Sequence, residues 1–404
     1  MEASFFKIQD ICTIKSGKRL PAGFDFSIDP TPFRYIRARD IKAGKISLDD
    51  VAHIDIETKK RIDKYIINEG DIAITIVANI GDIGFAKAEC DGVNLTENAV
   101  RLTSFDRNIV NSKYLAYYLG QPFMKAYMEN LAAGAAQSKL GIYKIERIKV
   151  LLPKLSVQKA VVDIIEQYDN LIEVNNKRIK VLEQMAENLY KEWFVRFRFP
   201  GHESVPFENS LPQGWGYCPV ESLADVLQRG ISPDYDDEGA LSVISQKCIR
   251  QNIMDIREAR RQTKAFGLEL NLQDGDTVIC STGTGTLGRV GQVYGCFPNT
   301  TFDSHVTLVR AKAPIGKHFL YWTLKEMQPW FMNMGIGSTN QQELYRSTIK
   351  NAKVLKPNCD LIERFEQMVE PIHGNIVSLI GSQDILVKQR DLLLPRLMSG
   401  KLEV

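Results

Sequence analysis

The chain lacks the features of a membrane or secreted protein. No window holds about 18 consecutive apolar residues, which is the length that a transmembrane helix needs. The first residues, Met1 to Phe6 followed by Lys7, have neither the charged nor the apolar region of a signal peptide. We therefore expect a cytoplasmic protein without a membrane partner.

Cysteine and histidine are both sparse. The seven cysteines are odd in number, scattered and never arranged as C-x-x-C, which argues against a disulfide framework and against a zinc site. The five histidines are isolated from one another and show no metal-ligand spacing. We expect reduced, mostly buried thiols, no metal site and no cofactor.

An excess of charge of one sign is also missing. The formal net charge is +2, so composition alone does not indicate a nucleic-acid binder. With 44% hydrophobic and 25% charged residues in 404, the chain has the composition of an ordinary globular protein with material for at least two cores.

The sequence repeats itself. Several motifs recur at a shift of 204 to 207 residues, which is about half of the chain. The matching pairs are Gly70-Asp71 and Gly275-Asp276, Gly81 and Gly288, Gly84 and Gly291, Gln137 and Gln341, Leu140 and Leu344, and Leu152-Pro153 and Lys356-Pro357. This spacing indicates two copies of one large unit rather than a solenoid of short repeats. A protein built in this way usually binds a ligand with two parts.

Each copy has the pattern of an α+β module. In the first module, residues 5 to 150, short apolar runs such as Ile72 to Ile76 are typical of strands, and a helical pattern follows from Ser112 to Leu131. The second module, about 215 to 355, has the same order and ends in a helix-like stretch from Lys317 to Met332.

Two long helices are predicted between and after the modules. Leu155 to Trp193 has no proline or glycine and a coiled-coil spacing of apolar residues, so it predicts a helix about 57 Å long at 1.5 Å per residue. Phe365 to Leu397 repeats the pattern, although Pro371 and Gly374 should kink it or break its first part. The predicted seam consists of Val161, Ile164, Leu171, Asn175, Leu182, Leu189, Phe365, Ile372, Leu379, Leu386 and Leu393.

The two seams most simply pack on each other as an antiparallel pair, with a pseudo-twofold axis between the modules. The alternative is that each helix packs on its own module, but the periodic run far exceeds the usual helix of about 11 or 12 residues. The predicted fold class is therefore α+β, with two pseudo-symmetric globular domains joined by two long helices that form an antiparallel coiled coil. We expect modules at 1–153 and 198–357, and helical spacers at 154–197 and 358–404.

Enzymatic signatures are weak or incomplete. The segment from Gly283 to Gly288 fits G-x-G-x-x-G, but the residues that follow predict a strand instead of the helix that a dinucleotide site requires. The Asn-Pro-Pro-Tyr or Asp-Pro-Pro-Tyr motif of an amino-methyltransferase is absent, and Ser245-Gln246-Lys247 lacks the second carboxylate of a metal-dependent nuclease. We expect a chain that binds and positions while its partners perform the chemistry.

The most specific motifs lie at the borders of these segments, at residues 152–158 (LPKLSVQ), 185–195 (MAENLYKEWFV), 211–215 (LPQGW) and 391–400 (DLLLPRLMSG). In this order they resemble the specificity subunit (HsdS) of type I restriction-modification systems over most of the chain. One departure is that the first module begins at Phe5 without the Leu-Pro-x-Gly-Trp motif that introduces the second.

The resemblance implies a non-catalytic, sequence-specific DNA-binding subunit. It implies two target-recognition domains, each reading one half of a split sequence in double-stranded DNA. It also implies that the helices set the spacing and dock methyltransferase subunits, two by expectation, with a restriction/translocase subunit joining through the complex. A rod of about 57 Å exceeds one DNA turn of about 34 to 36 Å, so an unread spacer is expected.

Candidate DNA contacts lie in polar, glycine-marked loops. Because Arg or Lys pairs with guanine and Asn or Gln with adenine, the candidates for base readout are Lys18, Arg19, Arg37, Arg39, Asn79, Gln137, Arg229, Gln246, Lys247, Thr284, Asn340 and Gln341. A structural turn role is equally consistent for the loops around Gln137 and Gln341.

Basic stretches recur at equivalent places, Arg34 to Lys64 and Lys247 to Lys264, and this favours a phosphate-facing surface on each module over a merely solvated one. Phosphate contacts are predicted at Lys59, Lys60, Arg61, Arg260 and Arg261, because charge runs rarely read bases. The alternative function is a bivalent scaffold that holds two protein partners without reading bases.

Overall fold

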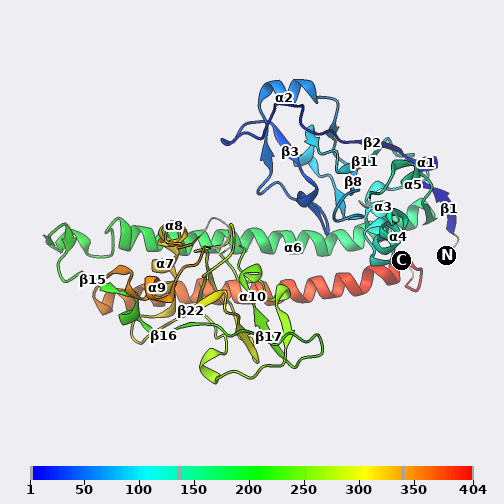
Figure 1. Cartoon of the computed structure of the whole chain (residues 1–404). Coiled ribbons are helices and arrows are strands. Elements are labelled where there is room, and N and C mark those ends of the chain that lie inside the picture. Colours follow the sequence, from blue (N-terminus) through cyan, green and yellow to red (C-terminus); the bar gives the residue numbers. More distant parts are fainter. Residues whose placement is uncertain (1–2, 134–138, 251, 338–341, 403–404) are drawn as a thin grey trace. The chain divides into compact units, whose positions relative to one another are not determined.

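The computed structural model describes residues 3–133, 139–250, 252–337 and 342–402, and it divides into two compact units (Figure 1). Unit 1 consists of Met1–Ile172 with Leu386–Val404, and unit 2 consists of Glu173–Ile385. Each unit therefore combines one α+β module with a part of each long helix. The predicted division into modules and spacers follows element type instead, and its boundaries stay a prediction.

The first module contains two sheets. The order of the larger sheet is β2-β11-β8-β9-β5-β4, and that of the smaller is β6-β3-β10-β7. The strands are β2 (Thr13–Ser16), β3 (Arg34–Ile36), β4 (Ile41–Lys42), β5 (Gly44–Ile46), β6 (Ala52–His53), β7 (Ile66–Ile67), β8 (Ile72–Thr75), β9 (Ile83–Phe85), β10 (Val93–Leu95) and β11 (Ala99–Thr103). The helices are α1 (Ile8–Ile11), α2 (Ile56–Arg61), α3 (Ser112–Leu119), α4 (Pro122–Ala132) and α5 (Ile142–Glu146). Strands β1 (Ala3–Lys7) and β12 (Lys149–Pro153) pair where the chain enters and leaves the module.

The second module repeats this order. Its main sheet runs β16-β22-β19-β20, which corresponds to β2-β11-β8-β9, and the smaller sheet runs β18-β17-β21. A parallel pair recurs in the smaller sheets, β10 with β3 and β21 with β17. The strands are β15 (Gly216–Pro219), β16 (Ala224–Arg229), β17 (Leu241–Ile244), β18 (Arg260–Gln262), β19 (Thr277–Cys280), β20 (Val290–Gln292), β21 (Thr300–Phe302), β22 (Val306–Ala311) and β23 (Lys353–Lys356). The helices are α7 (Lys317–Glu326), α8 (Gln328–Asn333) and α9 (Arg346–Asn351).

The repeated Gly-Asp motif is a structural device of the sheet. Gly70 and Gly275 have positive φ values of 82° and 84°, which glycine adopts without strain, and each ends a turn before a buried strand. The aspartate that follows forms a buried ion pair with an arginine of the neighbouring strand. Asp71 lies 2.8 Å from Arg101, and Asp276 lies 2.8 Å from Arg310. The motif therefore fixes the strand.

The long helices are α6 (Leu155–Tyr190) and α10 (Cys359–Met398). In each unit a short helix of the module is tied to one of them by an ion pair at the predicted shift of 204. Lys113 of α3 pairs with Glu166 of α6, and Lys317 of α7 pairs with Glu370 of α10. The repeat therefore extends to the way in which the helices are anchored.

The helices run antiparallel in both units, as predicted (Figure 1). In unit 1, Val161 of α6 shares a core with Leu397 of α10, and further along α6 Asp169 pairs with Arg390 at 2.8 Å. In unit 2, Ile179 packs with Ile376, and the Tyr190 and Phe365 rings lie 6.0 Å apart. Residues later in α6 thus contact residues earlier in α10. The ends of both helices also pack into the module cores. Packing of the helices on each other and packing of each helix on its own module, which the sequence offered as alternatives, therefore occur together.

The seam is displaced from the predicted positions. Val161, Asn175 and Phe365 are buried, but Leu171 is 51% exposed and Ile172 is buried in its place. The remaining predicted positions are partly buried: Ile164, Leu182, Leu189, Ile372, Leu379, Leu386 and Leu393. An α-helix with 3.6 residues per turn drifts against a strict heptad, and contacts with the modules turn the buried face further.

Helix α10 continues through Pro371 and Gly374 without the predicted break. Proline removes one backbone hydrogen bond, but the buried side chains of His373 and Ile376 hold the next turn against the rest of unit 2. In the part of the chain that the structure describes, no helix combines the length and the apolar character needed to cross a membrane.

Candidate nucleic-acid interface

Each module brings the same four chain segments together at one edge of its main sheet, and we call this set the loop edge. In the first module it consists of residues 17–19, 77–79, 96–98 and 139, and in the second of residues 230–232, 282–284, 303–305 and 343. An isolated bridge joins Val77 to Lys139, and the equivalent bridge joins Thr282 to Glu343.

A glycine closes each loop edge. A Cβ atom on Gly17 would lie 2.0 Å from the carbonyl oxygen of Thr96, and one on Gly230 would lie 2.1 Å from that of Phe302. Only glycine permits such a close approach of two backbones. The repeat in the sequence does not reveal this pair, because Gly17 and Gly230 are 213 residues apart and fall outside the shift of 204 to 207 residues.

The loop edge of the first module opens into a cavity of about 530 Å³. The lining residues are Ser16, Gly17, Lys18, Arg19, Tyr65, Ile76, Glu97, Lys139, Leu140, Gly141, Ile142 and Tyr143. Arg19 Nε lies 3.0 Å from Glu97 Oε1, and Lys18 Nζ lies 5.6 Å from the centre of the Tyr65 ring. Burial opposes the charge of Glu97, but hydrogen bonds from Arg19 and Thr96 outweigh it and lower the pKa of the carboxyl. The cavity therefore holds a charged acid among three cations.

Asn79 is exposed in the loop between β8 and β9, where Thr75 Oγ1 donates to its carbonyl oxygen. Arg37 and Arg39 lie outside the loop edge, next to β3. The Arg37 guanidinium donates to Asp40 at 3.1 Å and to the carbonyl oxygen of Asp50, and Arg39 pairs with the Asp50 carboxylate at 3.0 Å. These arginines are held by acids of their own module.

The loop edge of the second module carries a polar network. Arg229, the last residue of β16, pairs with Glu343, and His305 Nδ1 lies 2.6 Å from Thr282 Oγ1. Gln246 lies near the same loop, because a Cβ atom on Gly283 would be 3.6 Å from its Nε2 atom. The structure therefore brings Arg229, Gln246 and the Thr284 loop together.

Two of the remaining candidates are exposed and three lie outside the described residues. Lys247 and Thr284 are exposed beside the network of the second module. Gln137, Asn340 and Gln341 lie outside the described residues. The strand β20 follows Gly288, as the sequence predicted, where a dinucleotide site would need a helix.

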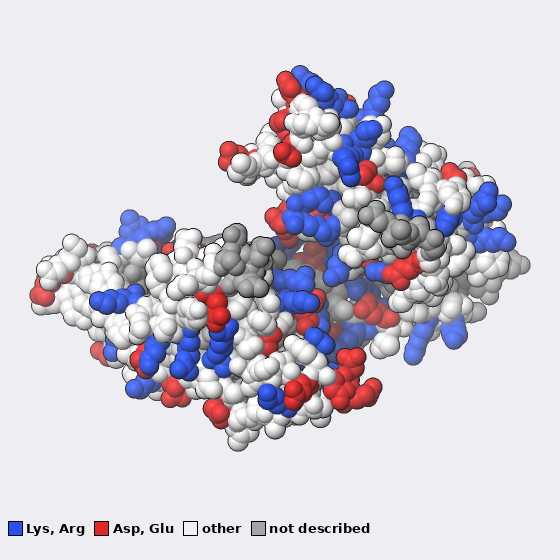
Figure 2. All heavy atoms as spheres, in the orientation of Figure 1, with Lys and Arg blue, Asp and Glu red and all other residues white. Residues whose placement is uncertain are grey.

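The predicted phosphate contacts divide between ion pairs and aromatic faces. Lys59 pairs with Asp63 at 2.8 Å, and the guanidinium groups of Arg61 and Arg260 lie 4.7 Å and 3.6 Å from the ring centres of Phe24 and Tyr235. Lys60 and Arg261 are exposed. Figure 2 shows many Lys and Arg side chains on the visible face of unit 1, mixed with acidic ones.

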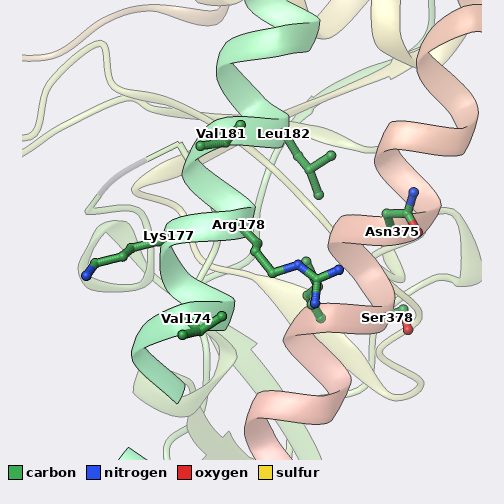
Figure 3. A pocket seen from close by; sticks show the side chains of 8 residues that line it. Val174, Lys177, Arg178, Val181, Leu182, Asn375 and Ser378 are labelled. Carbon is green, nitrogen blue, oxygen red and sulfur yellow. The ribbon is translucent and has the colours of Figure 1, made fainter. Parts of the chain in front are cut away.

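Helices α6 and α10 form a groove within unit 2, with a volume of about 620 Å³ (Figure 3). The lining residues are Val174, Lys177, Arg178, Val181, Leu182, Asn375, Ser378 and Leu379. Val174 and Val181 are 49% and 59% exposed, so they leave apolar surface open beside Arg178, which extends toward α10. The groove therefore combines an apolar floor with a cationic margin.

Comparison with known proteins shows a likeness to one family. A sequence model described as "Type I restriction modification DNA specificity domain" matches residues 2–184. Over most of its length the chain is similar to type I restriction-modification specificity subunits. The MjaIX specificity subunit of Methanocaldococcus jannaschii is 24% identical over 352 residues, which cover 84% of this chain and 79% of that protein. The HindI specificity subunit of Haemophilus influenzae is 22% identical and covers 94% of this chain and 96% of the relative.

A solved structure shares the fold of this chain. The crystal structure of the type I restriction-modification S subunit from M. genitalium aligns with a TM-score of 0.56 and 14% identity, over 98% of this chain and 96% of that chain. At this identity the likeness concerns the fold alone. It confirms the predicted fold class of two modules and two long helices.

The structure places further residues at the loop edges, namely Glu97, Lys139, Thr282 and Glu343, and adds Tyr143 as a lining residue of the cavity; none of these is among the candidates from the sequence. Lys139 and Glu343 are 204 residues apart, so the repeat shift could have found them, since each follows a repeated Gln by two residues. His305 stands beside Asp303 in the sequence and could join a polar site there, but the sequence does not reveal its partner Thr282, which is 23 residues away.

Proposed function

We propose that the chain is the sequence-specific DNA-binding subunit of a type I restriction-modification complex, in which each module reads one half of a bipartite duplex target. One observation carries the proposal. Both modules keep the same frame, including the closing glycine and the bridge behind it, yet their loop edges carry different side chains. A repeated frame with varied loops suits two readers of unlike half-sites.

Base readout in this proposal falls to polar side chains at or beside the loop edges. In the second module, Arg229 donates to Glu343, and this pair offers an arginine suited to guanine beside a carboxylate suited to cytosine. Gln246 and Thr284 lie next to it. In the first module, Asn79 is exposed and has the amide that pairs with adenine. Each good bidentate pair would contribute about 1–3 kcal/mol of discrimination.

Phosphate contacts would supply affinity that is independent of sequence. The exposed basic residues Lys60 and Arg261 suit this role on their respective modules. Arg61 and Arg260, which lie over aromatic rings, would hold their guanidinium groups in place for the same task.

The helices would set the distance between the half-sites. Helix α6 has 36 residues, which is about 54 Å at 1.5 Å per residue and longer than one DNA turn of about 34 to 36 Å. In this proposal residues 1–153 and 198–357 are the recognition domains, and residues 154–197 and 358–404 are the spacers.

The methyltransferase subunits, two in this proposal, would dock on the helices, and the restriction/translocase subunit would join through the complex. The groove between α6 and α10 supports this part, because exposed Val174 and Val181 would be covered by an apolar partner surface. The specificity subunit would position the DNA and leave catalysis to these partners.

Two measurements on the complex with its methyltransferase test the proposal. Binding to random duplex DNA should weaken steeply as salt rises, because phosphate contacts release counterions. Affinity that is independent of salt would favour a bivalent protein scaffold instead. On a panel of half-site variants, Gln246→Ala should relax discrimination at one position only, and a uniform loss across all sequences would exclude base readout by Gln246.

A further inference from the structure

The cavity at the loop edge of the first module has the chemistry of an anion site with an aromatic wall. Its cations are Lys18, Arg19 and Lys139, and its single acid is Glu97, so the charges sum to 3 − 1 = +2. Glu97 is already engaged by Arg19 at 3.0 Å. The excess positive charge therefore resides in Lys18 and Lys139, on two different chain segments that face one cavity.

An aromatic side chain completes this cavity. Tyr143 is 59% exposed, and its ring lies close over the backbone of Gly141, where a Cβ atom would be only 2.8 Å from the ring. Gly141 thus lets the ring lie flat at the rim. A planar, exposed ring next to cations suits a nucleotide, which presents a phosphate together with a sugar and a base.

The fold itself does not require these residues, because the second module lacks them. The closing glycines align Lys18 and Arg19 with Ile231 and Ser232: Lys18 N donates to Leu95 O at 2.9 Å, and Ile231 N donates to Phe302 O at 3.0 Å. The residues at the equivalent places of Lys139, Gly141 and Tyr143 are Glu343, Tyr345 and Ser347. At the places of the three cations and Tyr143, the second module keeps the frame with an apolar, an acidic and two small polar residues, and its own aromatic residue, Tyr345, stands at the place of Gly141.

We propose that the cavity of the first module holds one phosphodiester of the DNA backbone, with Arg19, Lys18 and Lys139 around the phosphate and the Tyr143 ring against the adjoining nucleoside. Among the described residues, the loop edge of the second module has no such cluster of cations. At their loop edges the two modules therefore differ in role: the first adds a salt-dependent phosphate anchor to the contacts elsewhere on both modules, while the second serves mainly discrimination. This inference rests on the proposed DNA-binding function and goes beyond it by assigning the anchor to one module.

Anisotropy titrations of the full chain in complex with its methyltransferase, on a random-sequence duplex over a KCl series, test the proposal. Lys139→Ala should reduce the slope of log affinity against log salt by about 1. The matched control is Lys350→Ala, which removes the same charge from the second module, where Lys350 pairs with Glu221 at 2.6 Å. The control should leave the slope unchanged.

A second pair of variants tests the aromatic wall without changing charge. Gly141→Ala displaces the ring and Tyr143→Ala removes it, so each should weaken binding by about 5-fold or more at constant salt slope. A melting temperature equal to that of the wild type would show that the first module of each variant is folded. Tyr143→Phe keeps the ring and should bind like the wild type.

Each outcome bears on the proposal. Equal slopes for Lys139→Ala, Lys350→Ala and the wild type would overturn it while leaving DNA binding intact. Competition by poly-glutamate as strong as by DNA of equal charge would also overturn it, because the site would then be one for acidic polypeptides. If the wild-type complex shows no salt-dependent DNA binding, the proposed function fails together with this inference.

Discussion

Replacement of Glu183 by glutamine should stabilise unit 2 at neutral and alkaline pH. Glu183 lies on α6, is 9% exposed, and has a carboxyl whose pKa is raised to about 7 by burial, although Lys325 draws it down. In the unfolded chain the ordinary value is 4.5. The folded state thus retains a proton over a range in which the unfolded state has lost it.

The size of the effect follows from this difference. A rise from 4.5 to about 7 is about 2.5 pKa units, and at 1.36 kcal/mol per unit the ionised carboxylate costs about 3 kcal/mol of folding free energy. Because the folded pKa is raised, this stability is fully present below pH 4.5 and is lost as pH rises through 7. The pKa of about 7 already includes the attraction between the Glu183 carboxylate and Lys325. Glu183→Gln should therefore be more stable than the wild type by up to about 3 kcal/mol at pH 8, and nearly equal to it at pH 4.5.

Urea denaturation at several pH values between 4.5 and 8 measures this difference for the full chain. Glu363→Gln is the matched control, since Glu363 lies on the other long helix of unit 2 and is exposed. Its difference from the wild type should not grow with pH. A Glu183→Gln difference that is constant over the pH range would refute the reasoning, because an uncharged packing effect has no such dependence.

Three further changes test the frame and the docking surface. Asp71→Asn leaves the arginine of the paired strand buried without its counter-charge and should cost about 3–5 kcal/mol of unfolding free energy in urea; a loss below about 1 kcal/mol would contradict the assigned role. Gly17→Ala should prevent the first module from closing, seen as a loss of its thermal transition, whereas Gly216→Ala, where a Cβ atom meets nothing within 4 Å, should leave the melting curve unchanged. Val181→Glu should weaken methyltransferase binding by about tenfold or more in a pull-down titration without a change in melting temperature, and Leu268→Glu, which is also exposed but lies outside the groove, should not; equal binding by both variants would exclude the groove as the docking surface.

The repeat explains why so much of the fold could be predicted. Gly70-Asp71 and Gly275-Asp276 recur because each strand needs the same turn and the same buried ion pair, and a pattern set by local backbone geometry is visible in the sequence. The ion pairs Lys113–Glu166 and Lys317–Glu370 are related by the repeat shift of 204 residues. They therefore explain why the sequence patterns of the two long helices recur at the same shift.

What the sequence did not predict depends on contacts between distant segments. Leu171 has the spacing of a seam residue, but the side on which a helix is buried is decided by the module packed against it, and Ile172 is buried instead. The pairing of Arg229 with Glu343 joins residues 114 apart, and nothing in either neighbourhood marks the other. The sequence therefore indicates the candidate loops. The contacts between residues of different loops are visible only in the structure.

The assembly of unit 1 from two segments that are far apart in the sequence has a consequence for synthesis. Its core contains Leu397, with Leu393 and Met398 packed against it, and these residues leave the ribosome after the whole of unit 2. Unit 2 is one continuous stretch, Glu173–Ile385, and is complete before them. A chain interrupted before Leu386 would carry a second module with all of its parts and a first module with an open apolar face. We therefore expect a product that lacks residues 386–402 to be bound by chaperones and degraded by proteases instead of being assembled.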